Sequence, residues 1–225
     1  DYRLLGRVSP VKDQGENGAC WIFSAMGTIE SAIMRNNGGQ AVDLSEEEIS
    51  SCHPLGESPA TDYHASAYIL RHGVASEANY PWNPNDSVCH APACGDYFIN
   101  DYSILNVSHL PLADRVRALK NLLYLNGPIS TGFVVYKDSD QVSGGGIYVW
   151  TGEQEIWGGH AVMLVGWKDD ATVVNGGYWI CKNSWGDRWG ENGFFRIAYG
   201  QAGIDDPMLD LVDHADLVGP ARRQR

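Results

Sequence analysis

The sequence predicts an α+β protein with two lobes, because helical periodicity fills its first half and short strand-like runs fill its second. Apolar residues at steps of three and four, typical of helices with one buried face, recur up to residue 125. From residue 129 onward, short runs of β-branched and aromatic residues are separated by glycines. A chain of 225 residues can bury one large core or two small lobes that share an interface. We expect the functional site in the cleft between such lobes.

The first half contains three predicted helices. We expect an extended start over residues 1–12, helices from Cys20 to about 36, over about 46–51 and over about 62–71, and a loop over 80–95. Pro10 limits any helix before it, and Asn-Asn-Gly-Gly at 36–39 stops the first one. Ser45 and Glu48, three residues apart, predict a capping box for the second helix. Gly73 closes the third.

The second half begins with one more helix and continues as strands. Apolar residues at helical spacing predict a helix over 112–125, which Asn-Gly-Pro at 126–128 ends. The strands are predicted over 129–136, 147–150, 160–167, 178–184 and 194–199. A helical half followed by a strand-rich half is typical of the α+β class.

The composition excludes several classes of partner. The net charge is −12, whereas binding to a nucleic-acid backbone requires clustered lysine and arginine. The basic residues at 222–225 stand alone at the end of the chain, where we expect a flexible tail. No apolar run is long enough to span a bilayer, and the amino terminus does not resemble a signal peptide. We therefore expect a soluble, already processed chain with no nucleic-acid or membrane partner.

A glycine-rich polar loop over residues 14–19 runs directly into Cys20 and the first helix. In the first turn of a helix, unpaired N–H groups and the positive end of the helix dipole favour an anion, and cysteine can supply one as a thiolate. The alternative is a buried structural thiol, the common fate of a free cysteine. The loop and helix alone leave both interpretations open.

Two later motifs also join polar groups to strands. Gly-Gly precedes His160 at the start of one predicted strand, and Lys-Asn183-Ser-Trp185 ends another. Taken singly, a histidine on an apolar strand is usually a core residue, and Asn-Ser-Trp is only a strand end. Their significance depends on what else the chain carries.

The order Gln14, Cys20, His160 and Asn183 resembles the papain-like cysteine proteases. Short motifs that match the family follow one another along nearly the whole chain, at 10–15, 20–24, 44–46, 80–82, 126–129, 159–162, 183–186 and 189–194. The resemblance implies a papain-like two-lobed fold with a helical lobe, an antiparallel β-barrel-like lobe and an active-site cleft between them. It implies a catalytic domain over 1–212, with lobes near 10–106 and 107–205, termini that cross between them, and a tail over 213–225.

The resemblance also implies roles for individual residues. Cys20 would be the nucleophile that forms a thioester, and His160 would act as acid and base. Asn183 would orient the imidazole, and Trp185 would shield that contact from water. The Gln14 side chain and the Cys20 backbone N–H would stabilise the oxyanion.

The substrate groove departs from the family pattern. The family usually has a cysteine three residues before the nucleophile, bonded to a Gly-Cys-x-Gly-Gly motif. Here Asn17 occupies the first position and Glu-Ser-Pro-Ala at 57–60 replaces the motif, so one whole disulfide is absent. Pro59 or Ala60 stands where glycines usually bind substrate, and the resemblance places Gly159 on the groove and Pro207 near the floor of the main specificity pocket, beside two aspartates.

The five cysteines leave at least one thiol unpaired within the chain. The family resemblance implies a disulfide between Cys52 and Cys89, with pairings that use Cys94 as alternatives. A zinc site built from the cysteines and histidines near residues 52 and 89–94 is a further alternative, although the spacing fits no common zinc pattern. We expect Cys181 to be an inert buried thiol, and no metal or cofactor.

The resulting hypothesis is a cysteine endopeptidase that acts on polypeptides. The chain between Tyr80 and Asn100 has no room for the insertion that makes one branch of the family an exopeptidase. The alternatives are a non-catalytic binding module with the same fold and a transpeptidase that uses the same thioester. The resemblance further implies an inhibitory propeptide before maturation, a monomer, and an extracellular or lysosome- or vacuole-like location.

Overall fold

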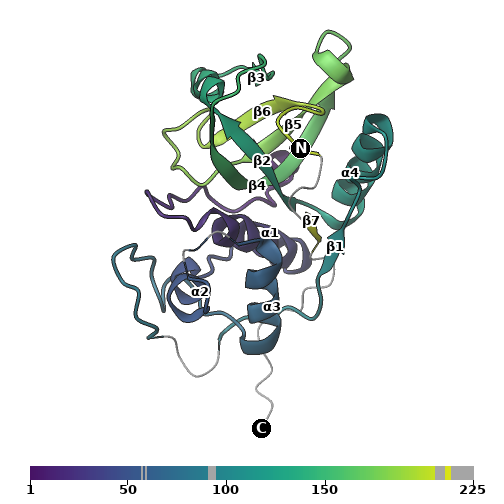
Figure 1. Ribbon diagram of the computed structural model, residues 1–225. Helices are drawn as coiled ribbons and strands as arrows, with labels where there is room; N and C mark the ends of the chain where they lie inside the picture. Colours follow the sequence, from purple (N-terminus) through teal and green to yellow (C-terminus); the bar gives the residue numbers. More distant parts are fainter. Residues whose placement is uncertain (57, 59, 91–94, 206–210, 214–225) are drawn as a thin grey trace.

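The computed structural model describes residues 1–56, 58, 60–90, 95–205 and 211–213. Its helices and strands gather in two regions (Figure 1), which confirms the predicted α+β class. The helices α1 (Cys20–Asn36), α2 (Glu46–Cys52) and α3 (Asp62–His72) form one region. The strands, together with α4 (Leu112–Asn126), form the other.

Helix α1 joins the two regions. It packs against α2 and α3 on one side and against strands β2 and β4 on the other. Every residue from Trp21 to Met34 is buried, including the charged Glu30. A helix enclosed by both lobes holds its first residue at their junction, so the position of Cys20 is fixed by the core.

Seven strands form one sheet, in the order β1, β7, β2, β4, β5, β6, β3. They are β1 (Ser103–Leu105), β2 (Ile129–Tyr136), β3 (Ile147–Tyr148), β4 (Ile156–Asp169), β5 (Gly177–Lys182), β6 (Phe194–Ala198) and β7 (Leu211–Asp213). Neighbouring strands are antiparallel except β3 and β6, which are parallel. This sheet forms the lobe for which we expected an antiparallel, β-barrel-like structure.

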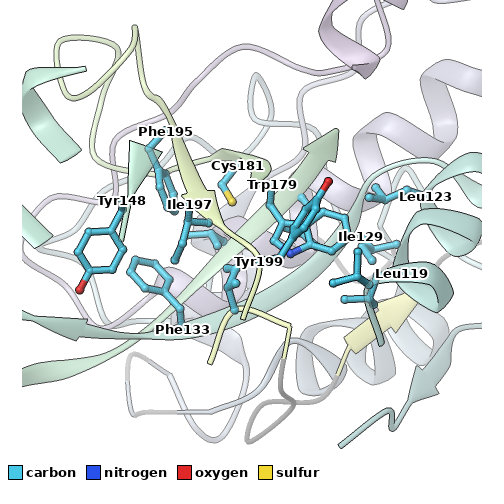
Figure 2. Close-up of a cluster of buried hydrophobic side chains, with 14 of the residues drawn as sticks. Leu119, Leu123, Ile129, Phe133, Tyr148, Trp179, Cys181, Phe195, Ile197 and Tyr199 are labelled. Atoms are coloured by element: carbon cyan, nitrogen blue, oxygen red, sulfur yellow. The ribbon is translucent and has the colours of Figure 1, made fainter. Parts of the chain in front are cut away.

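Each lobe has its own hydrophobic core. The core of the sheet lobe is built from aromatic and branched side chains of β2, β5, β6 and α4, several of which Figure 2 shows around Trp179. Cys181 lies in this core, fully buried, and burial raises the pKa of its thiol well above the ordinary value. A thiol held neutral in an apolar core is a poor nucleophile. The second core lies under α1, α2 and α3.

A cluster of charges, buried at Glu30 and Glu46 and exposed at Asp43, ties the amino-terminal segment to α1 and α2. Lys12 Nζ lies 3.0 Å from Glu30 Oε1, 2.8 Å from Glu46 Oε2 and 2.7 Å from Asp43 Oδ1. Burial opposes the ammonium charge, but the carboxylates of Glu30 and Glu46 outweigh it and raise the pKa of Lys12. Nearby, Lys182 Nζ donates to Ser9 Oγ at 2.9 Å, and burial lowers its pKa to about 8.

Several elements differ from the sequence-based expectation. Residues 1–12 are not wholly extended, because Tyr2–Leu5 forms a 3₁₀-helix whose first turn is capped by Asp1, with Arg3 N donating to Asp1 Oδ1 at 3.1 Å. Short 3₁₀-helices at Lys137–Gly144 and Val174–Gly176, and strands β1 and β7, were not predicted. The capping box of α2 is half formed, since Ser45 Oγ accepts from Glu48 N while the Glu48 carboxylate accepts from Ala75 N.

Candidate active site

Cys20 is the first residue of α1, with Ala19 as the N-cap. The first turn carries no acidic side chain, so the unpaired N–H groups and the helix dipole face the thiol without a competing anion on the same turn. Burial raises the pKa of the Cys20 thiol, and backbone hydrogen bonding at Ala161 and Trp21 opposes that shift. The thiolate therefore requires a nearby positive partner.

His160 lies on β4 with 4% of its surface exposed. Its Nε2 is 2.7 Å from Asn183 Oδ1, and the Trp185 ring stacks on the imidazole with centroids 4.4 Å apart. Asn183 Oδ1 also accepts from Ser184 N at 2.8 Å, which identifies that amide atom as the oxygen. His160 Nε2 must then carry the hydrogen, and Nδ1 is left as the basic nitrogen of the neutral ring.

Burial lowers the pKa of His160 to about 4, and the hydrogen bond to Asn183 acts against that shift. Taken one at a time, Cys20 and His160 are therefore each held neutral by burial. Transfer of the thiol proton to the imidazole creates two charges that stabilise each other in a medium of low dielectric. The arrangement favours a thiolate–imidazolium pair over either charge alone.

Cys20 and His160 line the same cavity, which has a volume of about 340 Å³. Its walls come from both lobes: residues of the α1 and α3 segments on one side and of β2 and β4 on the other. The lining residues are Gly18, Cys20, Trp21, Ala60, Thr61, Asp62, Thr131, Gly132, Gly158, Gly159, His160 and Ala161. The predicted substrate-binding residues Ala60 and Gly159 are among them, whereas Pro207 lies outside the described residues.

Gln14 is buried in the loop before α1 and is held at both ends of its amide. Its Nε2 donates to Asn17 O at 2.6 Å, and its Oε1 accepts from Ser184 Oγ at 2.6 Å. Gln14 N also donates to Ser184 O at 2.9 Å. These bonds tie the loop to the residue next to Asn183, although Gln14 is not among the described residues that line the cavity.

Hydrogen bonds hold the loop where the family's first disulfide is absent. Asn17 Nδ2 donates to Pro84 O at 3.4 Å, and Gly15 N donates to Asp13 Oδ1 at 2.9 Å. Asp13 also forms an antiparallel bridge with Trp185. The loop that precedes Cys20 is thereby attached to the strand end that carries Asn183.

The structure joins Cys52 and Cys89 in a disulfide, the pairing that the family resemblance implied. Two of the ligands required by the zinc alternative are consumed by this bond. Over the described part of the chain, no cluster of histidine, cysteine and acidic residues is arranged to hold a metal ion. Cys94, and with it Glu57 and Pro59 of the altered groove, lies outside the described residues.

Sequence reasoning missed part of the cavity wall. Thr61 and Asp62 at the start of α3, and Thr131 and Gly132 of β2, line the cavity beside the predicted residues. The sequence indicates Asp62 only as the first residue of a helix. No local pattern indicates that the start of α3 and the middle of β2 meet, because the contact depends on how the lobes pack.

A helical lobe, a sheet lobe and a cysteine and histidine that line one cavity define the class of papain-like cysteine proteases. The model of the papain family of cysteine proteases matches residues 1–209, and the chain belongs to this family. The recognition from sequence is confirmed. Within the described residues, no helix has the length and apolar character that crossing a membrane requires.

Individual relatives and solved structures agree with this assignment. Mouse cathepsin J is 33% identical over 205 residues, which is 88% of this chain and 59% of that protein. The Arabidopsis thaliana senescence-specific cysteine protease SAG12 is 32% identical over 88% of this chain and 55% of its own length. The chain thus spans little more than half the length of such relatives.

Solved structures also cover almost the whole chain. Digestive procathepsin L2 proteinase from the larval midgut of Tenebrio molitor has a TM-score of 0.78 at 31% identity, over 99% of this chain and 67% of that one. Bromelain from Ananas comosus, solved in complex with the E64 inhibitor, has a TM-score of 0.76 at 28% identity, over 98% and 97% of the two chains.

Proposed function

We propose that the chain is a cysteine endopeptidase that hydrolyses peptide bonds through a Cys20 thioester. The observation that carries the proposal is the Asn183–His160 contact, because it holds Nε2–H in place and leaves Nδ1 basic beside the cavity that Cys20 also lines. A nucleophile, a base and a group that orients the base are the parts that acyl transfer requires.

In the proposed reaction, His160 Nδ1 takes the thiol proton and Cys20 Sγ attacks the carbonyl carbon of the peptide. The carbon–nitrogen bond breaks as His160 returns that proton to the leaving amine, and a thioester remains. Water then attacks the thioester carbon while His160 Nδ1 accepts a proton from it. The carbon–sulfur bond breaks, the acid is released, and the thiolate–imidazolium pair is restored.

Both tetrahedral intermediates place a negative charge on the former carbonyl oxygen. We assign its stabilisation to the Cys20 backbone N–H at the start of α1 and to the second N–H of Gln14 Nε2. One hydrogen of that amide is engaged by Asn17 O, and the Oε1 end is anchored by Ser184, so the remaining hydrogen has a fixed direction. Loss of one oxyanion donor typically costs about 10²–10³ in rate.

The same thioester supports the transpeptidase alternative, in which an amine replaces water. Product analysis with and without an added amine acceptor separates the two outcomes. The other alternative, a non-catalytic binding module, rests on the altered groove. A binding module would not need Gln14, Cys20, His160 and Asn183 together.

The proposal extends to maturation and location. Procathepsins among the similar proteins support an inhibitory propeptide that precedes this segment. The disulfide between Cys52 and Cys89 supports an oxidising environment, extracellular or of the lysosome or vacuole type. We propose that the catalytic domain acts as a monomer; the sequence placed its end at residue 212, but Asp213 still pairs with Ser103 in the sheet, so we place the tail after residue 213.

The test compares Cys20→Ser with Cys181→Ala, because both remove a free thiol. We expect Cys20→Ser to abolish cleavage of a fluorogenic peptide and labelling by E64, the inhibitor named in the bromelain structure. Cys181→Ala should keep both, since that thiol lies in the core of the sheet lobe. Cleavage or labelling that survives in Cys20→Ser would refute the proposed function.

A further inference from the structure

Two exposed asparagines begin short motifs that the proposed catalytic chemistry does not use. Each is followed, two residues later, by serine, which is the pattern of an acceptor for N-linked glycosylation. The two segments are Asn85-Asp86-Ser87 and Asn106-Val107-Ser108. Both asparagines are exposed, and neither is among the described residues that line the cavity. A glycan on either one would be attached outside the described wall of the active site.

The fold anchors the second segment by its middle residue. Val107 lies in the core of the sheet lobe with 2% of its surface exposed, and its carbonyl oxygen accepts from Leu110 N at 2.9 Å. Asn106 and Ser108, on either side of it, are exposed. The segment therefore keeps its apolar residue inside and presents both polar residues at the surface, where a glycan on Asn106 does not disturb the core.

The Asn106 amide is held in one orientation by the serine of the same motif. Its Oδ1 accepts from Ser108 Oγ at 2.7 Å and from Ser108 N at 3.1 Å. Because a backbone N–H can only donate, the accepting atom is the amide oxygen, and neither bond uses Nδ2. Hydrogen bonds given to an amide oxygen polarise the group and make its N–H protons more acidic. The nitrogen is the atom that forms the bond to the sugar.

These two bonds are local. The residues they join are two positions apart, and an asparagine side chain commonly bonds the backbone two residues further on. Such a turn needs no distant part of the chain, so it can form while the protein is being made and before the lobes pack. The geometry at Asn106 is thus available when glycans are added as well as in the folded protein.

The first segment differs in its middle residue. Asp86 carries a carboxylate there, whose Oδ1 accepts from Val88 N at 3.0 Å. Within the described residues, no hydrogen bond joins Ser87 to the Asn85 side chain. The donor of an N-linked glycan is a sugar attached to a lipid through pyrophosphate, which is an anion. A carboxylate beside the acceptor amide repels that donor.

We propose that Asn106 is a site of N-linked glycosylation and that Asn85 is not. A transferase joins Asn106 Nδ2 to the anomeric carbon of the lipid-linked sugar, the bond from that carbon to the pyrophosphate oxygen breaks, and the amide proton passes to a base of the transferase. The proposal goes beyond the peptidase function and uses only the proposed location, which the disulfide between Cys52 and Cys89 supports.

The experiment maps both sites in the protein secreted by cultured eukaryotic cells. An amidase that removes N-linked glycans converts each glycosylated asparagine to aspartate, and digestion in heavy-oxygen water labels that aspartate. Peptide mass spectrometry then reads both sites in one sample and also reports whether Cys52 and Cys89 are joined. We expect the label on Asn106 in most molecules and on Asn85 in few.

Variants test the hydroxyl and the charge separately. Ser108→Ala keeps Asn106 but removes the hydroxyl that donates to its amide, and should abolish the label there, whereas Ser108→Thr keeps a hydroxyl and should retain the label. Asp86→Ala removes the carboxylate from the other segment and should raise the labelling of Asn85. Ser87→Ala is the matched control, because it alters the same position of the other motif and should leave Asn106 labelled as in the wild type.

Two results would overturn the proposal without any measurement on a variant. One is an unlabelled Asn106 in molecules that contain the disulfide between Cys52 and Cys89, since those molecules have passed through an oxidising compartment. The other is labelling of Asn85 that equals or exceeds that of Asn106. Neither reading depends on peptide cleavage, so loss of the proposed endopeptidase function would appear only in the cleavage and E64 assays.

Discussion

Replacing Asn183 by alanine removes the hydrogen bond that its side chain makes to the His160 ring. The contact is 2.7 Å long, buried, and enclosed by the stacked ring of Trp185. Without it, nothing holds Nε2 as the protonated nitrogen. Because the bond also raises the pKa of His160 against the effect of burial, the imidazolium becomes harder to form.

The magnitude follows from the nature of the bond. A hydrogen bond to a charged group contributes about 1.5–3 kcal/mol, and the imidazolium is charged at the moment when it must donate to the leaving amine. At about 1.4 kcal/mol per factor of ten, we expect kcat/KM to fall by about 10- to 150-fold. The loss should appear in kcat, since Asn183 is not among the described residues that line the cavity.

The assay is hydrolysis of a fluorogenic peptide by active enzyme, with the concentration of sites titrated by E64. Asn79→Ala is the control, because Asn79 also makes one short side-chain bond, to Asp96 at 2.7 Å, but lies exposed and away from the cavity. A kcat/KM for Asn183→Ala within threefold of the wild-type value would refute the argument that this bond orients and charges His160.

Two further predictions concern stability. Lys12→Met leaves the buried carboxylates of Glu30 and Glu46 without their cation, and should lower the free energy of unfolding in urea by about 3–5 kcal/mol. The exposed Lys137–Glu155 pair is the control, because Lys137→Met should change the free energy of unfolding by less than about 1 kcal/mol. Equal losses in Lys12→Met and Lys137→Met would contradict the argument. Burial lowers the pKa of His160 to about 4 in the folded state, so the unfolded chain binds the proton more tightly. In Cys20→Ala, the free energy of unfolding should therefore fall as the pH drops from 6.5 to about 4. At about 1.4 kcal/mol per pKa unit, the loss approaches about 3 kcal/mol, and an equal pH dependence in the variant that also carries His160→Gln would contradict it.

Local patterns predicted the elements that carry their own signal, including the short helix α2, but they missed the first four residues of β4 and the elements that depend on distant partners. Helices α1, α3 and α4 and strands β2, β5 and β6 carry their own periodicity, and their bounds fall within a few residues of the prediction. Strands β1 and β7 are three residues each and exist because they pair with one another and, through β7, with β2. The 3₁₀-helix at Tyr2–Leu5 likewise depends on a cap by Asp1 that no periodicity reveals.

The sequence alone determined the class of chemistry, because Cys20 after a glycine-rich loop, His160 after two glycines and Asn183 before an aromatic are short motifs in a fixed order. Only the tertiary structure decided which other groups share their cavity. Asp62 and Ser130 are 68 residues apart and meet because α3 and β2 both pack against α1. Contacts of this kind come from the packing of whole elements, so no window of the sequence contains them.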